Sequence, residues 1–198
     1  MEINLPKRLL IFASGSGSNA ENLIHFFREL ENSIIAEVVG IICNNSQAGV
    51  IQRAERLDIP CHIISNEQWQ NKEFMIELVV KTSPHLIILA GFLKKFPVEL
   101  INIVNGNVIN LHPALLPKFG GKGMYGMNVH KAVIEYKEKE TGITIHWVNE
   151  HYDEGNIIQQ FSFTVTKEDT PETIAHKIHD LEYAHFPEVV KQLLLERS

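Results

Sequence analysis

The sequence predicts an α/β protein: a doubly wound, mostly parallel sheet with helices on both faces and an antiparallel C-terminal extension. Continuous apolar runs of strand length, such as residues 7–14 (KRLLIFAS) and 86–91 (LIILAG), predict the parallel part, because segments with helical apolar spacing alternate with them. The strand patterns at 142–148 and 156–165 predict the extension, because they lie too close together for a helical crossover.

The first half of the chain predicts four strands, each followed by a helix. The strand segments are apolar throughout, as in parallel strands that helices cover on both faces. The helical segments repeat apolar residues at helical spacing, as Leu23, Phe27 and Leu30 do in the first of them. Proline is tolerated in a first helical turn, so Pro97 suits a helix start. In order, the predicted elements are strand 7–14, helix 20–30, strand 36–43, helix 50–57, strand 61–65, helix 74–81, strand 86–91 and helix 97–104.

The second half begins with a short apolar strand that contains an amide and ends at an imidazole. The hydrophobic pattern changes beyond Gly142, where two strand-like segments follow each other with only a turn between them. These two segments are therefore expected to be antiparallel or edge strands. The predicted elements are strand 107–111, a helix at about 129–137, and strands 142–148 and 156–165.

A final helix is predicted from the segment DTPET (169–173). Thr170 or Asp169 would cap its N-terminus, and Pro171 would lie in its first turn. The helix would continue to about Arg197, with a kink or break at Pro187, which lacks a backbone N–H.

Composition restricts the class of protein. The 198 residues carry a formal charge of −6, with 44% hydrophobic and 21% charged residues, as in one ordinary globular domain spanning 1–198. An acidic chain without basic runs is a poor match for nucleic acid. No apolar run is long enough to span a membrane, and no secretory signal is recognised. The two cysteines, Cys43 and Cys61, lack the spacing of a metal site or a disulfide framework. We therefore expect a cytoplasmic protein with small-molecule ligands, no nucleic acid and no membrane.

A glycine-rich turn follows the first strand and opens the first helix. Gly15 and Gly17 permit a tight turn in which backbone N–H groups approach a ligand, and a helix N-terminus favours an anion. Ser16, Ser18 and Asn19 add side-chain donors. The turn therefore predicts a phosphate site, although a tight turn without any ligand remains an alternative.

The same turn matches the dinucleotide fingerprint in form, as Gly15-x-Gly17-x-x-Ala20. That fingerprint also expects an acidic residue about 20 residues further on, at the end of the second strand. Asn44 and Asn45 stand at that end, without a carboxylate. We therefore expect a single phosphate rather than NAD.

Asn110, His112 and Asp153 form a candidate catalytic set. In an open parallel sheet, ligands bind beyond the carboxyl ends of the strands, where the glycine turn, Gly91 and His112 are all expected to lie. A carboxylate near His112 would raise its pKa, and the Asn110 amide would stabilise an oxyanion. These groups suit acyl transfer to an amine. The alternative is a strand-end histidine held by a backbone carbonyl.

Other polar residues have less specific interpretations. The chain has ten histidines, but no HExxH motif, and His176, His179 and His185 are better explained by a solvated or packed helix than by a metal site. His146 alternates with apolar neighbours, so it faces either outward or toward the crevice. Lys118 is interpreted as a solvated charge, as is Lys122. No metal is expected.

Four motifs, in order and spacing, give a resemblance that spans Leu9 to about Pro187. The chain resembles the folate-dependent glycinamide ribonucleotide transformylase family, the phosphoribosylglycinamide formyltransferases of purine synthesis. The motifs are SGSGSN (14–19), LAGFLKKF (89–96), VINLHPALLPKFGG (108–121) and GITIHWVNEHYDEGNII (142–158).

The resemblance implies an enzyme with a formyltransferase fold that transfers the formyl group of 10-formyltetrahydrofolate to the amine of 5-phosphoribosylglycinamide, as a monomer or homodimer. Asn110 and protonated His112 would stabilise the oxyanion during direct amine attack, and Asp153 would keep His112 charged. It implies a Rossmann-like phosphate-binding half at about 1–106 and a catalytic, folate-binding half at about 107–198. It also implies a phosphate site at Gly17, Ser18 and Asn19, a glycinamide contact at Glu182, and a folate site at Gly91, Leu93, Phe96 and Asn110.

The chain departs from this family pattern in two places. The segment GGKGMYGMNVH (120–130) is longer than the corresponding loop, so no family contact is transferred to it. No counterpart is evident for a cofactor-contacting arginine in SNEQWQNKEF (65–74). Three alternative functions are considered. Methionyl-tRNA formyltransferase would need an RNA-binding domain and a basic face, and formyltetrahydrofolate hydrolase would need a further N-terminal domain. The third alternative is an inactive phosphate-binding module.

Overall fold

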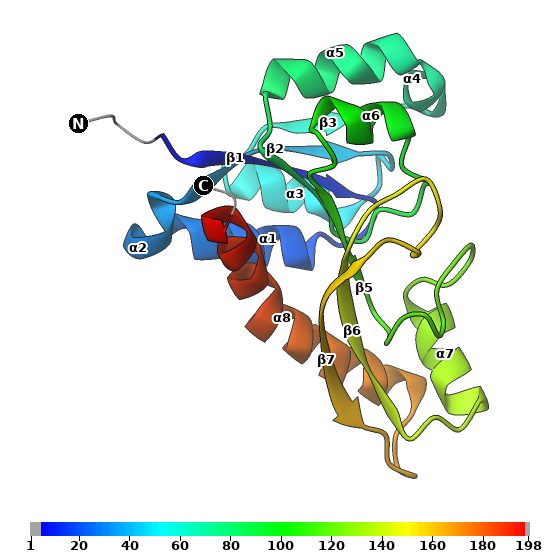
Figure 1. The fold of residues 1–198 in the computed structure, drawn as a ribbon. Coiled ribbons are helices and arrows are strands. Elements are labelled where there is room, and N and C mark those ends of the chain that lie inside the picture. Colours follow the sequence, from blue (N-terminus) through cyan, green and yellow to red (C-terminus); the bar gives the residue numbers. More distant parts are fainter. Residues whose placement is uncertain (1–4, 197–198) are drawn as a thin grey trace.

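A computed structural model describes residues 5–196, which form one seven-stranded sheet in the order β3-β2-β1-β4-β5-β6-β7 with helices around it (Figure 1). The strands are β1 (Lys7–Ala13), β2 (Ala36–Cys43), β3 (Cys61–Ile63), β4 (Leu86–Leu89), β5 (Val108–His112), β6 (Glu140–Trp147) and β7 (Ile157–Thr164). The helices are α1 (Ser18–Arg28), α2 (Leu30–Ser33), α3 (Gly49–Arg56), α4 (Asn66–Gln70), α5 (Lys72–Thr82), α6 (Val98–Ile103), α7 (Met127–Glu135) and α8 (Pro171–Glu196).

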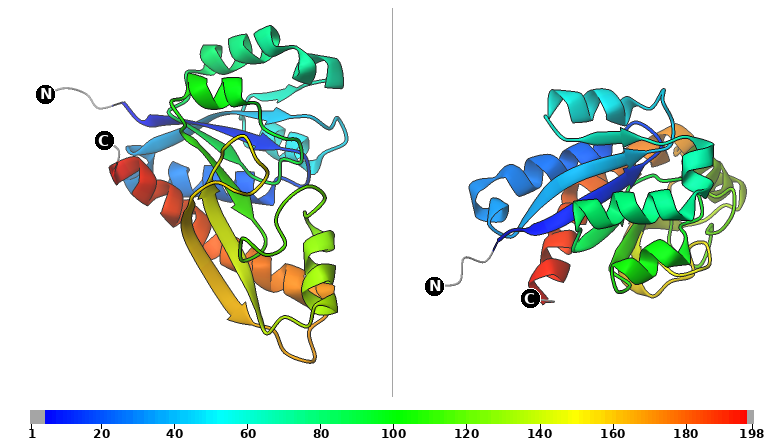
Figure 2. Two further views of the ribbon diagram at one scale, coloured as in Figure 1. Left: turned by 45° about the vertical axis from the view of Figure 1, so that its right-hand side comes forward. Right: turned by 90° about the horizontal axis from the view of Figure 1, so that it is seen from above.

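The first five strands are parallel, and helices cover both faces of the sheet, as the sequence predicts. Along β1, Leu9 and Ile11 enter one core with α1, α3 and α8, whereas Leu10 and Phe12 enter a second core with α5 and α6. Successive strand residues point to opposite faces, so a strand between two helical layers must be apolar throughout. The two layers are visible on either side of the sheet in Figures 1 and 2.

The C-terminal extension is antiparallel. β6 pairs antiparallel with β5 and β7, and β7 forms the edge of the sheet. The prediction of antiparallel or edge strands is therefore confirmed, since only a short turn joins β6 to β7.

The final helix begins at Pro171, as predicted. Of the two proposed caps, Thr170 accepts a backbone N–H of the first turn, that of Thr173, at 3.3 Å, whereas Asp169 accepts from the Thr173 hydroxyl at 2.9 Å. The helix continues through Pro187 without a break. Its predicted end at Arg197 lies outside residues 5–196.

Two short helices, α2 and α4, are not predicted from the sequence. α4 has a capping box: the Gln68 N–H donates to Ser65 Oγ at 3.2 Å, and the Ser65 N–H donates to Gln68 Oε1 at 2.8 Å. The spacing Ser-x-x-Gln is a known start signal, but the segment lacks a buried apolar face because none of its residues is buried. Hydrophobic periodicity therefore gives no indication of it.

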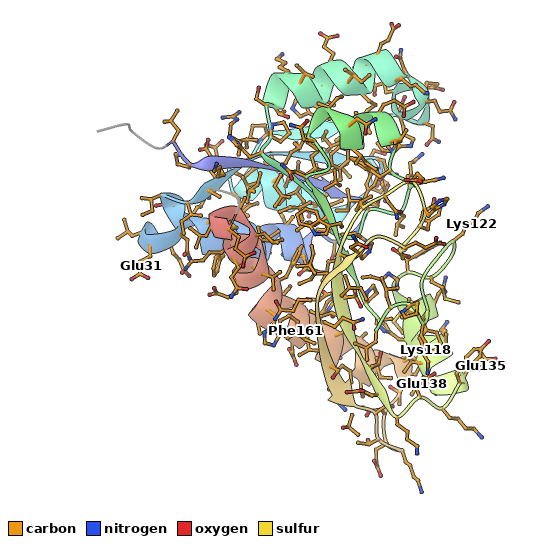
Figure 3. The ribbon with its side chains drawn as sticks, in the orientation of Figure 1. Glu31, Lys118, Lys122, Glu135, Glu138 and Phe161 are labelled. Carbon is orange, nitrogen blue, oxygen red and sulfur yellow. The ribbon has the colours of Figure 1, made fainter. Side chains whose placement is uncertain are left out.

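Charged side chains occupy the outside of the molecule (Figure 3). Lys118 contacts both carboxylate oxygens of Glu138 at 2.9 Å, beyond the end of α7. Its charge is thus paired on the surface rather than directed at a ligand. Lys122 is exposed as well, but it lies at the edge of the cavity described below.

Candidate active site

A cavity of about 580 Å³ lies at the carboxyl ends of β1, β4 and β5, where an open α/β sheet binds its ligands. It extends between the glycine turn before α1, the loop after β4, the turn between β6 and β7, and helices α7 and α8. Of the residues singled out from the sequence, those that line it are Gly15, Ser16, Gly17, Ser18, Asn19, Gly91, Leu93, Asn110, His112, Lys122, Asp153, His179 and Glu182.

The glycine turn is shaped by close packing against α3. Gly17 has φ +77°, and a Cβ there would lie 2.4 Å from Val50 Cγ2. Only glycine fits this left-handed conformation at this distance. Arg53 donates from Nε to the Ser16 carbonyl at 2.9 Å. Ser18 and Asn19, the first residues of α1, line the cavity, so the N-terminus of this helix faces it. The turn can therefore hold an anion with backbone N–H groups.

Ser14 ties the end of β1 to the loop after β4. Its N–H donates to the Gly91 carbonyl at 3.1 Å, and its Oγ accepts from the Leu93 N–H at 3.1 Å. Its Oγ–H donates to Asn44 Oδ1 at 2.6 Å. Asn44, directly after β2, therefore holds the serine that joins these two segments, in the place where a dinucleotide site has an acid.

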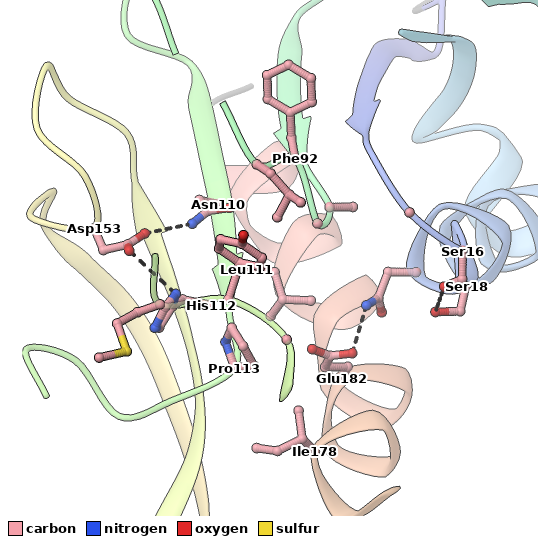
Figure 4. Close-up of a pocket in the computed structure, with 18 of the residues that line it drawn as sticks. Ser16, Ser18, Phe92, Asn110, Leu111, His112, Pro113, Asp153, Ile178 and Glu182 are labelled. Carbon is pink, nitrogen blue, oxygen red and sulfur yellow. Dashed lines mark hydrogen bonds and ion pairs between the residues drawn. The ribbon is translucent and has the colours of Figure 1, made fainter. Parts of the chain in front are cut away.

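Asn110 and His112 point away from the apolar core because of strand alternation. Ile109 and Leu111 of β5 enter the core with α8, so the two residues between and after them face the other side. His112 is only 3% exposed. Figure 4 shows Asn110, His112 and Asp153 together on one side of the cavity, with Glu182 of α8 across from them.

The tautomer of His112 follows from its partners. Its Nε2 lies 2.8 Å from the Phe119 carbonyl, which can only accept, so Nε2 carries the hydrogen. Its Nδ1 lies 3.6 Å from Asp153 Oδ2. The backbone-carbonyl contact considered as an alternative from the sequence is thus present, but it occupies only one nitrogen. The other nitrogen remains directed at the carboxylate.

Asn110 is held between two acceptors. Its Nδ2 donates to Asp153 Oδ1 at 3.2 Å and lies 3.1 Å from His146 Nε2. His146 Nδ1 lies 2.8 Å from the Trp147 carbonyl, so Nδ1 carries the hydrogen and Nε2 accepts. His146 is 2% exposed and is the β6 register partner of Asn110. Of the two orientations left open for His146, the outward one is wrong: the ring is buried against Asn110 and Asp153, behind the residues that line the cavity.

Asp153 reaches these groups from a tight turn. Its φ of +55° is left-handed, a conformation that aspartate adopts more readily than most residues. A Cβ at Gly155 would lie 1.6 Å from the Trp147 carbonyl, so the turn folds directly onto β6. The Gly121 N–H donates to Asp153 Oδ2 at 2.8 Å. The Asp-x-Gly spacing therefore fixes where the carboxylate lies.

Burial and charge act in opposite directions on this cluster. Burial lowers the pKa of His112, and although Asp153 and the Phe119 carbonyl raise it, the pKa stays below its ordinary value. Burial alone would raise the pKa of Asp153, but His146, His112 and the Gly121 N–H hold it below its ordinary value. The expected imidazolium is therefore not the resting state. His112 is neutral and Asp153 is ionised at neutral pH.

Glu182 lies across the cavity on α8. It accepts a hydrogen bond from Asn19 Nδ2 at 2.8 Å and is 6% exposed. Burial raises the pKa of its carboxyl to about 7, and the Asn19 contact only partly opposes this shift. The structure thus joins the glycine turn to the last helix, 163 positions away in sequence.

The loop after β4 supplies an apolar wall, although not with all of the expected residues. Leu93 lines the cavity and is 46% exposed. Phe96 does not line it: its side chain is 4% exposed and lies in the second core, where its ring centroid is 5.1 Å from that of Phe12. Phe92 lines the cavity in its place. The expectation that Phe96 forms a folate wall is therefore corrected.

Several cavity residues have no role assigned from the sequence. They lie on α7, α8 and the two turns, and include His130, Tyr152, Ile178 and His179. In the part of the chain that the structure describes, no group of three or more His, Cys, Asp or Glu could hold a metal ion. None of the helices within residues 5–196 has both the length and the apolar character needed to cross a bilayer.

A family model, related sequences and solved structures all relate this chain to formyl transferases. Residues 7–190 match the family described as formyl transferase. The chain is 37% identical over 192 residues to phosphoribosylglycinamide formyltransferase of Bacillus subtilis (strain 168), covering 95% of each protein. It is similar in structure to phosphoribosylglycinamide formyltransferase from Bacillus halodurans, with a TM-score of 0.85, 32% identity, and coverage of 97% of each chain.

A chloroplastic phosphoribosylglycinamide formyltransferase of Arabidopsis thaliana is 36% identical over 201 residues. That alignment covers 96% of this chain, whereas the chain spans 66% of the Arabidopsis protein, less than two thirds of its length.

Proposed function

The chain belongs to the formyl transferase family, and on this premise we propose that it transfers the formyl group of 10-formyltetrahydrofolate to the amine of 5-phosphoribosylglycinamide, in purine biosynthesis. One observation supports this most directly. Asn110, His112 and Asp153 meet within hydrogen-bonding or ion-pair distance at the wall of a cavity that also reaches the glycine turn. A phosphate and a reactive carbonyl can therefore be held in one site.

We propose the following roles for the binding residues. Gly17, Ser18 and Asn19 hold the substrate phosphate at the N-terminus of α1. Gly91 and Leu93, together with Phe92, border the folate ring system, and Glu182 contacts the glycinamide half. The cavity, at about 580 Å³, is within the size range of small-molecule sites.

The proposed reaction begins with attack of the neutral amine on the formyl carbon. The carbonyl electron pair moves onto oxygen, and one N–H of Asn110 turns from its present acceptor to the developing oxyanion. His112 Nδ1 accepts the proton that the amine loses, which forms an imidazolium beside Asp153 and the oxyanion. His112 then gives this proton to the folate nitrogen as the carbon–nitrogen bond breaks and the carbonyl re-forms.

This mechanism differs in one respect from the expectation based on the sequence. Because the resting His112 is neutral, its charge arises during the reaction, and Asp153 stabilises it only then. The Phe119 carbonyl holds the opposite nitrogen, Nε2, and this contact keeps Nδ1 directed at Asp153.

The test is formyl transfer by the purified chain, followed through the product folate, with both substrates present. We expect turnover by the native sequence, and a kcat about 10²–10⁴-fold lower for His112→Ala, the usual size of a general acid–base effect. Lys118→Ala, on the surface, should match the native sequence. Near-normal turnover by His112→Ala, or none by the native sequence, would refute the assignment.

We further propose that the reaction takes place in the cytoplasm, on small-molecule substrates, with the protein as a monomer or homodimer.

A further inference from the structure

Two polar atoms at the cavity have no protein partner. Asn19 Oδ1 and His130 Nδ1 are buried and make no hydrogen bond with any residue in 5–196. Both residues line the cavity. Buried polar groups in native proteins are almost always paired, because an unpaired group loses its hydration without replacement. Each unpaired atom therefore calls for an explanation, and a ligand group is the simplest one for atoms at a cavity wall.

His130 is the more unusual of the two. It lies on α7, which packs against α8, and it is 5% exposed between the buried Val129 and Val133. No hydrogen bond to either of its ring nitrogens is formed within residues 5–196. Burial, with a smaller contribution from nearby His179, lowers the pKa of its imidazole to about 4. A buried ring without a hydrogen bond gains nothing from its polar nitrogens, so burial alone does not account for a histidine here.

The donors and acceptors in this corner suit hydroxyl groups. A neutral imidazole offers one donor and one acceptor, and Asn19 Oδ1 offers an acceptor. Glu182, which Asn19 holds, faces the same space. An anion would instead need several donors or a fixed positive charge. A sugar hydroxyl both donates and accepts, so adjacent hydroxyls of a pentose match this set.

We infer that His130 is a specificity residue, whose ring hydrogen-bonds a pentose hydroxyl of the phosphoribosyl substrate beside Asn19 and Glu182. This inference rests on the proposed function, and it adds a role for the 120–130 segment that the resemblance left without one. His130, Asn19 and Glu182 line the same cavity as the glycine turn and Asn110, His112 and Asp153, so a pentose joining a phosphate to a reacting amine would lie in that cavity too.

His130→Leu separates this role from a structural one. Removing an unpaired buried polar group should leave the Tm unchanged or raise it, because the unliganded protein loses no hydrogen bond. The KM for 5-phosphoribosylglycinamide should rise about 10-fold, the size of one lost hydrogen bond. The KM for the folate and kcat should stay close to their native values. His176→Leu, an exposed histidine on α8 outside the cavity, is the matched control.

Substrate analogues that lack the 2- or 3-hydroxyl of the pentose complete the test. The native protein should bind one of them as weakly as His130→Leu binds the full substrate, and the variant should lose nothing further with that analogue. Unchanged KM for the full substrate in His130→Leu would overturn the inference, as would a fall in Tm accompanied by a rise in both KM values. Absence of any turnover by the native protein would refute the proposed function instead.

Discussion

The glycine turn before α1 and the proposed catalytic cluster at the end of β5 face the same cavity, but they are built in opposite ways. The turn is a contiguous segment, residues 15–19, whose shape depends on backbone conformation and on contact with α3. The catalytic cluster takes Asn110, His112, His146 and Asp153 from three segments and depends on side-chain hydrogen bonds. We therefore expect the turn to be sensitive to added atoms and the cluster to changes of charge.

Asp153→Asn should have the largest effect. Asparagine also tolerates a left-handed φ, so the turn should keep its shape while the cluster loses its negative charge. We expect kcat to fall about 10²–10⁴-fold, as when an orienting carboxylate is removed from a histidine. The pKa of His112, already below its ordinary value, should fall further, moving the acid limb of the kcat/KM profile to lower pH.

Glu154→Gln is the control for this charge, since the exposed neighbour in the same turn has no role in the cluster. Equal activity losses in the two variants, or an unmoved acid limb in Asp153→Asn, would contradict the role given to Asp153.

Gly17→Ala should have the second largest effect, and it should appear first in stability. The added Cβ would lie 2.4 Å from Val50 Cγ2 at a φ of +77°. We expect the free energy of unfolding to fall by about 2–4 kcal/mol, measured by urea denaturation. At Gly15 no heavy atom lies within 4 Å of the added Cβ, so Gly15→Ala should change stability by less than about 0.5 kcal/mol. Similar losses for both variants would mean that contact with α3 does not shape the turn.

Glu182 joins the two regions and should make stability depend on pH. The pKa of its carboxyl in the folded protein, about 7, lies above the unfolded value. The contribution of Glu182 to the free energy of unfolding is therefore fully present at low pH and is lost as the pH rises toward 7. Glu182→Gln keeps an acceptor for Asn19 but does not ionise. Relative to the native sequence, we expect the variant to gain about 3 kcal/mol between pH 4 and pH 8. Parallel stability curves, from denaturation at a series of pH values, would contradict the raised pKa.

His146→Leu should have the smallest effect. It removes one of the two acceptors of the Asn110 amide and leaves Asp153 in place. We expect kcat to fall about 10-fold with little change in either KM, because a misdirected donor weakens only the transition state. His146→Gln, with an oxygen that can accept from Asn110, should recover part of the activity in the same assay. Failure of the glutamine to exceed the leucine would mean that His146 does not orient Asn110.

Much of the fold follows from local patterns. Apolar runs place the strands of the parallel part, and helical spacing places their helices, because burial on two faces leaves a clear signature in the sequence. The short helices α2 and α4 escape this reasoning, since they bury little and are held by caps and turns. Phe96 shows another limit: an aromatic residue in a loop after a strand can line a cavity or fill a core. Phe92 and Phe96 both pack edge-on against Phe12, yet only Phe92 also lines the cavity.

Residue types and spacing were enough to predict that Asn110, His112, Asp153 and the glycine turn lie at one cavity, because strand alternation and tight turns are local properties of the chain. The protonation of His112, the inward orientation of His146 and the unpaired ring of His130 depend on burial and on neighbours far away in sequence. Those are properties of the assembled molecule, since the free energy of a charge or a hydrogen bond depends on everything that excludes water around it.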